Sequence, residues 1–400
     1  MNTLIVHLTH YSVKLPPLYY GGSERVAWWL ALRQSLFKPY IKQILSSDAV
    51  IIALIGCFND TLVNYCDGRK LDDLLLFDAC ILKPYRSSFA DYRYMLNLAK
   101  YVHLLTEIFG VDRVIVHNHV LQRNSWLILP VFLKLFKTLS NKKVDIIHVL
   151  TLHYDPPTSK LLACLDHLIY SLRSSLIAIS KSQFIRLRSL FKRSLITYVY
   201  NGLPIENYPF SRDKEDYYLY LGAITPSKGP HIAVMLAKKL NIRLYIAGPI
   251  RNYTYFNTFI KPFLNSNIKY LGEVDEKVKL RLLSKAKALI FPVQREEYFG
   301  LVAVEAMACG TPVITFARGA MPEIITHRVT GFLARNMYEM FKYIKDVNSI
   351  DPIACRKHVE EKFSSKHMCL RYVTLYAKLM DLWDNQKGLD KRKTKEDYCI

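Results

Sequence analysis

The chain has 400 residues, a length that favours two domains over a single core. Its hydrophobic share of 51% excludes an intrinsically disordered chain, and no run reaches the roughly 18 apolar residues of a membrane-spanning helix. The formal net charge of +21 is spread over both halves and predicts anionic partners, namely nucleotide sugars, anionic lipid headgroups or, less favoured, nucleic acid. The alternative is a lineage bias toward Lys and Arg.

The eight cysteines form no CxxC pair, so their spacing predicts free thiols and no zinc site. The first apolar segment, Leu4 to Val6, is too short for the core of a signal peptide. We therefore expect a cytoplasmic protein that contacts the inner face of a membrane at most peripherally.

Strands and helices alternate through the first half of the chain. Helices are predicted to start at Ser23 and to cover 91–109, whereas the polar segment 57–90 gives no prediction. Buried strands are predicted at 3–8, 49–56, 112–117, 144–152 and 175–180. This alternation predicts a doubly wound parallel sheet that binds ligands at the carboxyl ends of its strands.

Polar residues follow three of these strands. Gly21 and Gly22 lie between the first strand and its helix, and His153 ends the strand at 144–152. The strand at 112–117 ends in His117, and His119 lies two residues later. Their spacing lacks the pattern of a metal site, so we expect histidines that are hydrogen-bonded at a strand end.

A basic segment, 181–193, contains five Lys or Arg residues and no acid, with apolar residues between them. Such a helix is typical of a membrane-surface or partner-binding element. A solvated helix face that packs through its apolar side is an equal alternative.

An Asn-Gly turn at 201–202 and the polar run 211–216 predict a domain boundary. We expect an acceptor-side domain over 1–203 and a donor-binding domain over 204–365. A helix over 366–385 is predicted to return to the first domain, followed by a charged, disordered tail over 386–400.

The second domain restarts with a strand at 217–221, a loop that contains Lys228, and a helix at 231–240. A cation at a helix start is placed to neutralise a diphosphate. Two further strands are predicted at 241–249 and 267–274.

The segment from Phe291 to Glu323 contains the strongest pattern. After a strand at 288–291, a polar loop with Glu297 leads to Gly300 and an apolar helix that ends at Gly310. The free amides of the helix start make Phe299 to Val302 a predicted phosphate site. Glu305, the one carboxylate of that helix, is expected to face a cleft and accept hydrogen bonds from ligand hydroxyls. The alternative is an ion pair between Glu305 and an internal Arg or Lys.

The segment EYFGLVAVEAMACGTPVI, with Glu297 and Glu305 eight positions apart and GAMPE after it, resembles the signature of retaining GT-B glycosyltransferases of family 4. The resemblance implies an α/β fold with two doubly wound Rossmann-like domains that face a central cleft. It also implies sugar transfer, with retained anomeric configuration, from a nucleotide-diphosphate donor to the hydroxyl of a glycolipid, glycan or protein glycan. The nucleotide sugar is then a co-substrate, and neither cofactor nor metal is needed.

The resemblance also assigns roles to residues. Glu305 holds the ribose, Glu297 orients the donor sugar, and Lys228 holds the diphosphate with the amides of Phe299, Gly300 and Leu301. His153 contacts the sugar, which makes His153, Glu297 and Lys228 the predicted catalytic set. Gly22 closes over the phosphates, and the loops with Gly248, Pro249 and Val274 hold the nucleotide base.

One position departs from the family pattern. Ala223 stands where the family has an Arg that grips the diphosphate, and Arg295, Arg251 or Arg25 is the expected substitute. Three other functions stay open: a glucosyltransferase that acts on DNA bases, a sugar-nucleotide epimerase, and a weakly catalytic donor-binding or membrane-docked protein.

Overall fold

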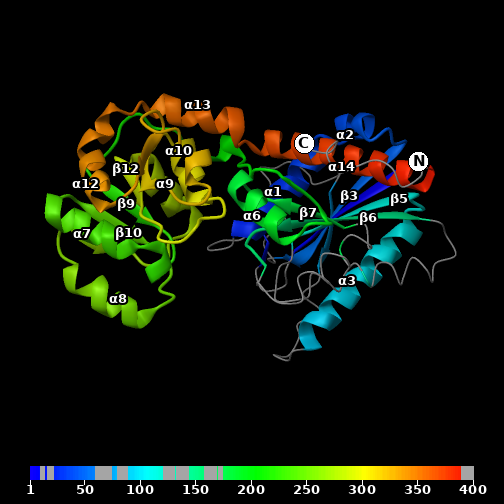
Figure 1. Cartoon of the computed structure of the whole chain (residues 1–400), viewed down its shortest axis with the longest axis horizontal. Helices are drawn as coiled ribbons and strands as arrows, with labels where there is room; N and C mark the ends of the chain where they lie inside the picture. The colour runs from blue at the N-terminus through cyan, green and yellow to red at the C-terminus, as the bar shows by residue number, and fades with distance from the viewer. Residues whose placement is uncertain are drawn as a thin grey trace. The chain divides into compact units, whose positions relative to one another are not determined.

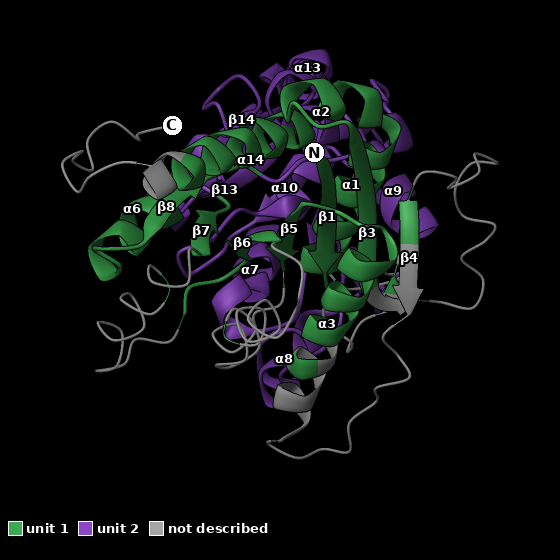
Figure 2. Cartoon of the chain, turned by 90° about the vertical axis from the view of Figure 1, so that its right-hand side faces the viewer, with its two compact units in different colours: residues 1–179, 183–200, 368–400 green, residues 180–182, 201–367 purple. Residues whose placement is uncertain are grey.

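The computed structural model describes residues 1–9, 14–15, 22–58, 74–78, 89–119, 131, 144–156, 169 and 174–388. The chain divides into two compact units, each with its own parallel sheet (Figure 2). Unit 1 comprises residues 1–179, 183–200 and 368–400, and unit 2 comprises 180–182 and 201–367. Helix α14 (Ser365–Gly388) starts in unit 2 and continues into unit 1.

The sheet of unit 1 has the order β2-β3-β1-β5-β6-β7-β8, with β4 paired to β3. Every pairing is parallel. The strands are β1 (Asn2–Leu8), β2 (Lys14–Leu15), β3 (Ala49–Phe58), β4 (Leu74–Asp78), β5 (Arg113–Asn118), β6 (Asp145–Leu152), β7 (Ser174–Ala178) and β8 (Leu195–Tyr198). From β1 the chain adds strands on the side of β3, and from β5 onward it adds strands on the opposite side. The strand order therefore reverses between β1 and β5.

Helices cover both faces of this sheet, because side chains of a strand alternate between its faces. Ile5 of β1 packs in a cluster with residues of α1 (Gly22–Leu36), α2 (Lys38–Ile44) and α14. Leu4 and Val6 pack on the opposite face with residues of α3 (Phe89–Ile108). Figure 1 shows α14 and α3 on opposite sides of the sheet. The remaining described helix of this part, α6 (Lys181–Leu190), packs beside β6 and β7.

The sheet of unit 2 has the order β11-β10-β9-β12-β13-β14 and is also parallel. Its strands are β9 (Tyr218–Leu221), β10 (Leu244–Ala247), β11 (Ile268–Tyr270), β12 (Ala288–Phe291), β13 (Val313–Phe316) and β14 (Gly331–Ala334). Its helices are α7 (Pro230–Leu240), α8 (Tyr253–Phe259), α9 (Glu276–Lys285), α10 (Leu301–Ala308), α11 (Met321–Ile324), α12 (Met337–Asp346) and α13 (Pro352–Lys362). This is the strand order of the Rossmann fold, and its ligand crevice lies where β9 and β12 meet.

The expected doubly wound Rossmann-like architecture is thus confirmed for both units. Strand β4 lies in the segment 57–90, where no element was predicted. The facing of the two domains across a central cleft and the exact domain bounds stay predictions. Most of the predicted tail, from residue 389 onward, lies outside the described residues.

Among the helices that the structure describes, we find none with the length and apolar composition needed to cross a membrane.

Candidate functional site

Two loops meet at the crevice of unit 2, one after β9 and one after β12. The amide of Gln294 donates to the carbonyl oxygen of Ser227 at 2.8 Å. Gly229 has φ +71°, and a Cβ atom there would lie 2.2 Å from the carbonyl oxygen of Pro292. Only glycine permits both the left-handed backbone and this close approach. The two loops are therefore fixed against each other, which places Lys228 beside Glu297.

Lys228 and Glu297 form an ion pair at this point. The ammonium Nζ of Lys228 lies 2.5 Å from Oε2 of Glu297, and the two side chains are only 15% and 9% exposed. Burial lowers the pKa of Lys228, and the attraction of Glu297 opposes that shift. Arg295 approaches the same carboxylate oxygen at 3.9 Å and is half exposed. The site thus holds two cations around one buried carboxylate.

The loop with Glu297 is fastened from its other side by the segment after β13. The amide of Ala320 donates to the carbonyl oxygen of Glu297 at 2.8 Å, and the Arg318 guanidinium donates to that of Gln294 at 2.5 Å. Gly319, with φ +56°, would place a Cβ atom 2.3 Å from the carbonyl oxygen of Glu297. The position of Glu297 therefore depends on close backbone packing.

Helix α10 begins directly after this loop, as predicted. Gly300 is its N-cap at φ +84°, and Gly310, just past its end, has φ +76°. The first helical hydrogen bond is donated by the Ala303 amide to the Gly300 carbonyl at 2.9 Å. The amides of Leu301 and Val302 precede that bond, and such free amides are suited to bind an anion.

Glu305 is buried and has an internal cation as its partner. Its side chain is 4% exposed, and Oε1 accepts hydrogen bonds from Lys279 Nζ at 2.7 Å and from the Tyr208 hydroxyl at 3.1 Å. Lys279 also contacts Glu276 at 2.9 Å. An unpaired buried carboxylate would cost several kcal/mol, so the alternative of an internal lysine partner is the one observed. The assignment of Glu305 to the ribose stays a prediction.

The predicted base-binding residues lie at the same edge of the sheet. Gly248 and Pro249 follow β10, and a Cβ atom on Gly248 would lie 2.1 Å from the carbonyl oxygen of Gly222. The Tyr270 hydroxyl donates to the Gly248 carbonyl at 2.7 Å. Val274 lies in the loop before α9 and after β11. The edge thus brings these loops together with the loop of Lys228.

Ala223 offers no cation at this edge. Its side chain is 7% exposed, and its carbonyl oxygen accepts a hydrogen bond from the Tyr220 hydroxyl at 3.0 Å. Of the expected substitutes in unit 2, Arg295 lies next to Glu297, and Arg251 is exposed after β10. Arg295 is therefore the substitute that the geometry of unit 2 favours.

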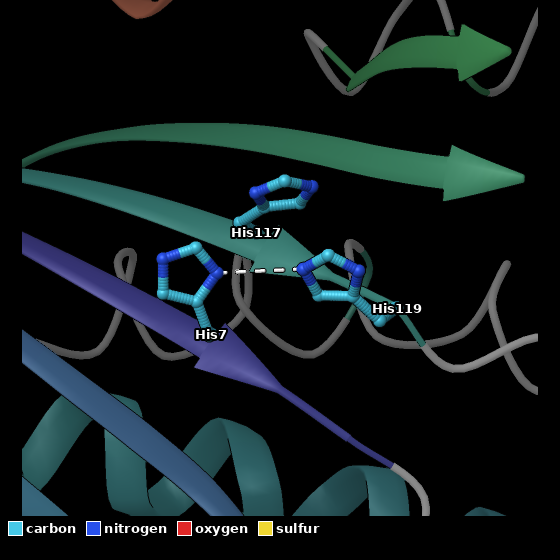
Figure 3. Close-up of side chains that lie close together, drawn as sticks. All are labelled: His7, His117 and His119. Carbon is cyan, nitrogen blue, oxygen red and sulfur yellow. Dashed lines mark hydrogen bonds between the residues drawn. The ribbon is translucent and has the colours of Figure 1, made fainter. Parts of the chain in front are cut away.

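In unit 1, His153 follows the end of β6 within a row of imidazoles. His153 Nε2 lies 3.3 Å from His119 Nδ1. His119 Nε2 lies 3.4 Å from His7 Nδ1, a contact that Figure 3 shows as a dashed line. His7 Nε2 lies 2.8 Å from Oε1 of Gln34 on α1. Gly22 is the first residue of α1, and Gly21 lies outside the described residues.

His7 was missed in the sequence. The parallel register pairs His7 of β1 with His117 of β5, and the period of two puts both rings on the face that α1 and α14 cover. His119 follows two residues later on the same face. Ile5 and His7 are two positions apart, which places His7 on the same face of β1 as Ile5. This pattern points to His117 only when the register between β1 and β5 is known.

His117 is hydrogen-bonded at its strand end, as expected. Its ring nitrogens lie 2.6 Å from the Tyr376 hydroxyl and 2.7 Å from the Thr151 hydroxyl. Burial lowers the pKa of His7 and of His153 to about 4 in each case. Burial, followed by repulsion between the rings, holds the pKa values of His117 and His119 well below 6.5. The row is therefore a set of neutral imidazoles near pH 7.

The sequence of this chain is similar to that of known glycosyltransferases. Residues 205–350 match the family model of glycosyl transferases group 1. A curated relative, an uncharacterized glycosyltransferase of Methanocaldococcus jannaschii, is 26% identical over 255 residues, which are 63% of this chain and 69% of that protein. Two further curated relatives align over 54% and 47% of their own lengths.

Solved structures show the same fold over nearly the whole chain. A glycosyltransferase from Rickettsia africae has a TM-score of 0.68 at 19% identity and covers 95% of this chain and 99% of its own. The HepE protein of Anabaena, solved with UDP and glucose, has a TM-score of 0.62 at 18% identity and covers 96% of this chain and 100% of its own.

The fold is therefore that of the GT-B glycosyltransferases, two Rossmann-like α/β domains. Within it, the segment 205–350 that matches the group 1 model contains Lys228, Glu297, Gly300 and Glu305.

Proposed function

We propose that this protein transfers a sugar from a nucleotide-diphosphate donor to a hydroxyl acceptor. The observation that supports this most directly is the Lys228–Glu297 pair beside the start of α10, at the crevice of the matched domain. A buried cation and free helix amides are the groups that bind a diphosphate. A neighbouring carboxylate accepts hydrogen bonds from sugar hydroxyls.

Donor binding would rearrange this ion pair. The diphosphate competes with Glu297 for Lys228, and the exchange frees the carboxylate for the donor sugar. Arg295 is close enough to share in the new arrangement. Cations that remain on the leaving diphosphate stabilise the charge that develops in the transition state, which is commonly the largest single catalytic effect. Lys279 and Tyr208 orient Glu305, whose carboxylate accepts hydrogen bonds from the ribose hydroxyls of the donor.

The finer properties belong to the same proposal. They are membership of family 4, retention of anomeric configuration, independence of metal, and donor contacts by His153 and Gly22. UDP-glucose is the first donor to test, because a structural neighbour was solved with that ligand. The acceptor class is a glycolipid, glycan or protein glycan.

The direct test is the release of nucleoside diphosphate from a panel of nucleotide sugars, measured by chromatography. Lys228→Gln and Glu297→Gln should each lower the rate by about 10²–10³-fold, the usual effect of removing one transition-state contact. Lys261→Gln, an exposed lysine elsewhere in unit 2, is the matched control and should keep the wild-type rate. Equal, slow release by wild type and Glu297→Gln would refute the catalytic role.

A second candidate is a donor-binding protein with weak turnover, which the buried Ala223 favours because one phosphate-binding cation is missing. A thermal-shift series with UDP and UDP-glucose separates the two, since a ligand that binds the native state raises the melting temperature. Stabilisation by both compounds without any release of UDP would favour the binding protein.

The basic segment 181–193 supports a further proposal, peripheral binding to an anionic membrane that holds a lipid-linked acceptor. In the structure, Arg186 of α6 pairs with Asp155 at 3.0 Å, whereas Lys181 and Arg188 are exposed. Sedimentation with anionic vesicles at low salt tests it, and absence from the pellet would reject it. Binding to duplex DNA with a steep salt dependence would instead favour the DNA-base glucosyltransferase.

A further inference from the structure

The three histidines at the carboxyl ends of β1 and β5 lie close enough to share one ligand. One ring nitrogen each from His7, His117 and His119 lie within 4.8 Å of one another, and all three residues are buried. Figure 3 shows the rings of His7 and His119 pointing toward each other from neighbouring strand ends, with the His117 ring beside them. The strand order of unit 1 reverses at this point, which is the usual ligand position of a doubly wound sheet.

The distance between the ring nitrogens of His7 and His119 distinguishes a hydrogen bond from a pair of metal ligands. His7 Nδ1 and His119 Nε2 are 3.4 Å apart. Hydrogen bonds donated by N–H groups normally span about 2.7–3.2 Å, so this contact is long for one. A tetrahedral ligand set with metal–nitrogen distances of about 2.0–2.1 Å has its nitrogens about 3.3–3.4 Å apart. The pair matches one edge of such a tetrahedron.

A metal-binding histidine needs a hydrogen-bond acceptor at the ring nitrogen that does not bind the metal, and each of the three rings has one. His7 Nε2 faces the amide oxygen of Gln34 at 2.8 Å, and His119 Nδ1 faces His153 Nε2 at 3.3 Å. His117 faces the hydroxyls of Tyr376 and Thr151, one at each nitrogen. Metal-ligating histidines almost always donate their second N–H to such an acceptor, which fixes the tautomer.

We propose that His7, His117 and His119 bind one divalent transition-metal ion, with zinc as the ion that three imidazole ligands favour. His7 contributes Nδ1 and His119 contributes Nε2. His117 contributes one ring nitrogen after its ring turns, because its stacked position on His119, with centroids 4.1 Å apart, does not aim a lone pair at the same point. The hydroxyl at its other nitrogen remains its partner.

The three ligands differ from the residues proposed to hold the donor, of which Lys228, Glu297 and Glu305 lie in unit 2 and His153 and Gly22 lie in unit 1. A metal ion binds an imidazole through the ring nitrogen that carries no proton. Three protein ligands leave a fourth position for water or a ligand group.

Metal uptake by the untagged full-length chain tests the proposal. The chain is stripped with a chelator, equilibrated with Zn²⁺, desalted and analysed for zinc, and it should retain one ion per chain. Co²⁺ should give the visible absorption of a tetrahedral nitrogen site. His7→Asn and His119→Asn should lose the ion. His148→Asn is the matched control, because His148 is buried on β6 of the same unit outside the cluster, and it should keep the ion.

Two further measurements do not depend on replacing a ligand. X-ray absorption of the zinc-loaded wild type should show three imidazole nitrogens at about 2.0–2.1 Å. Gln34→Leu, which removes the acceptor behind His7 and a hydrogen-bond partner of Tyr376, should weaken zinc binding by about 10–100-fold. The proposal is overturned if the wild type retains no stoichiometric zinc, if its absorption spectrum shows sulfur or carboxylate ligands, or if both His→Asn variants bind as the wild type does.

Discussion

The backbone of Gly319 packs directly on the backbone of Glu297, so that a Cβ atom on Gly319 would lie 2.3 Å from the Glu297 carbonyl oxygen and 2.5 Å from its amide nitrogen. Neither atom can move without displacing the loop that presents the Glu297 carboxylate. Gly319 has no side chain of its own, but its backbone thus determines the position of Glu297, the proposed sugar-binding residue.

Gly319→Ala should therefore impair both stability and activity. We expect a loss of more than about 2 kcal/mol in the free energy of unfolding, from backbone strain and from the clash. Nucleoside diphosphate release should fall as well, because Glu297 shifts. Gly272→Ala is the matched control: Gly272 has a similar φ of +79°, but nothing lies within 4 Å of its Cβ position. That variant should lose only about 1–2 kcal/mol and keep its activity. Equal effects in urea titrations of both variants would contradict the argument.

The buried pair of Lys279 and Glu305 should be sensitive to the loss of either partner. Lys279→Met leaves the Glu305 carboxylate without its cation and should cost roughly 3–5 kcal/mol. The double variant Lys279→Met/Glu305→Gln should be more stable than the sum of the single changes predicts. Chemical denaturation of the four proteins measures this coupling. Lys277→Met, an exposed position on the same helix, should change stability by less than about 0.5 kcal/mol. Additive single changes would show that the pair is not coupled.

Arg356 of α13 ties the start of unit 2 to the end of α10. Its guanidinium donates to the carbonyl oxygens of Tyr208 at 2.8 Å, Ala308 at 2.7 Å and Ile205 at 3.1 Å. The three carbonyls are reached by two different nitrogens of the planar guanidinium, a spread that the single ammonium nitrogen of a lysine cannot reproduce. Arg356→Lys should therefore already cost about 2 kcal/mol of stability. Donor affinity, measured by calorimetry with the nucleotide sugar, should fall too, because Tyr208 positions Glu305.

The neighbouring exposed residue provides the comparison for that change. Lys357 forms a solvent-exposed pair with Glu361 at 3.8 Å, so Lys357→Met should be close to neutral. Wild-type stability in Arg356→Lys would show that the three carbonyl contacts do not contribute.

Local patterns in the sequence were sufficient for most elements of the fold. Four apolar residues before Pro292 predicted β12, and Gly300 and Gly310 predicted both ends of α10, because glycine adopts the left-handed caps that other residues resist. The alternation of strands and helices then implied parallel sheets. These are short-range properties, and the residues that determine them are adjacent in the chain.

Partners that are distant in the sequence could not be predicted. The isolation of Glu305 in an apolar helix indicated that it needs a partner, but Lys279 and Tyr208 come from separate elements 26 and 97 positions away. His7 and His117 meet only through the register of β1 and β5. Side-chain pairing across a sheet depends on this register, and the composition of one strand does not specify it.

His148 provides a test of acid sensitivity apart from the proposed metal ligands. Its ring is 3% exposed on β6, Nδ1 lies 3.0 Å from the Ser174 hydroxyl, and burial lowers its pKa to about 3. In the unfolded chain an imidazole has a pKa of about 6.5. Between these values the unfolded chain binds a proton that the native state does not, so stability falls as the pH decreases from about 6.5 toward 3.

His148→Asn should remove that part of the acid sensitivity, because asparagine keeps a polar contact with Ser174 and does not titrate. The wild type should lose up to about 1.4 kcal/mol per pH unit through this residue below pH 6.5. Urea unfolding at pH 7.5 and pH 5 measures the difference, and other buried histidines contribute equally to both proteins. We therefore expect the variant to be less stable than the wild type at pH 7.5, and this deficit to shrink or reverse at pH 5. A deficit of the same size at both pH values would mean that His148 takes up its proton equally in the native and unfolded states.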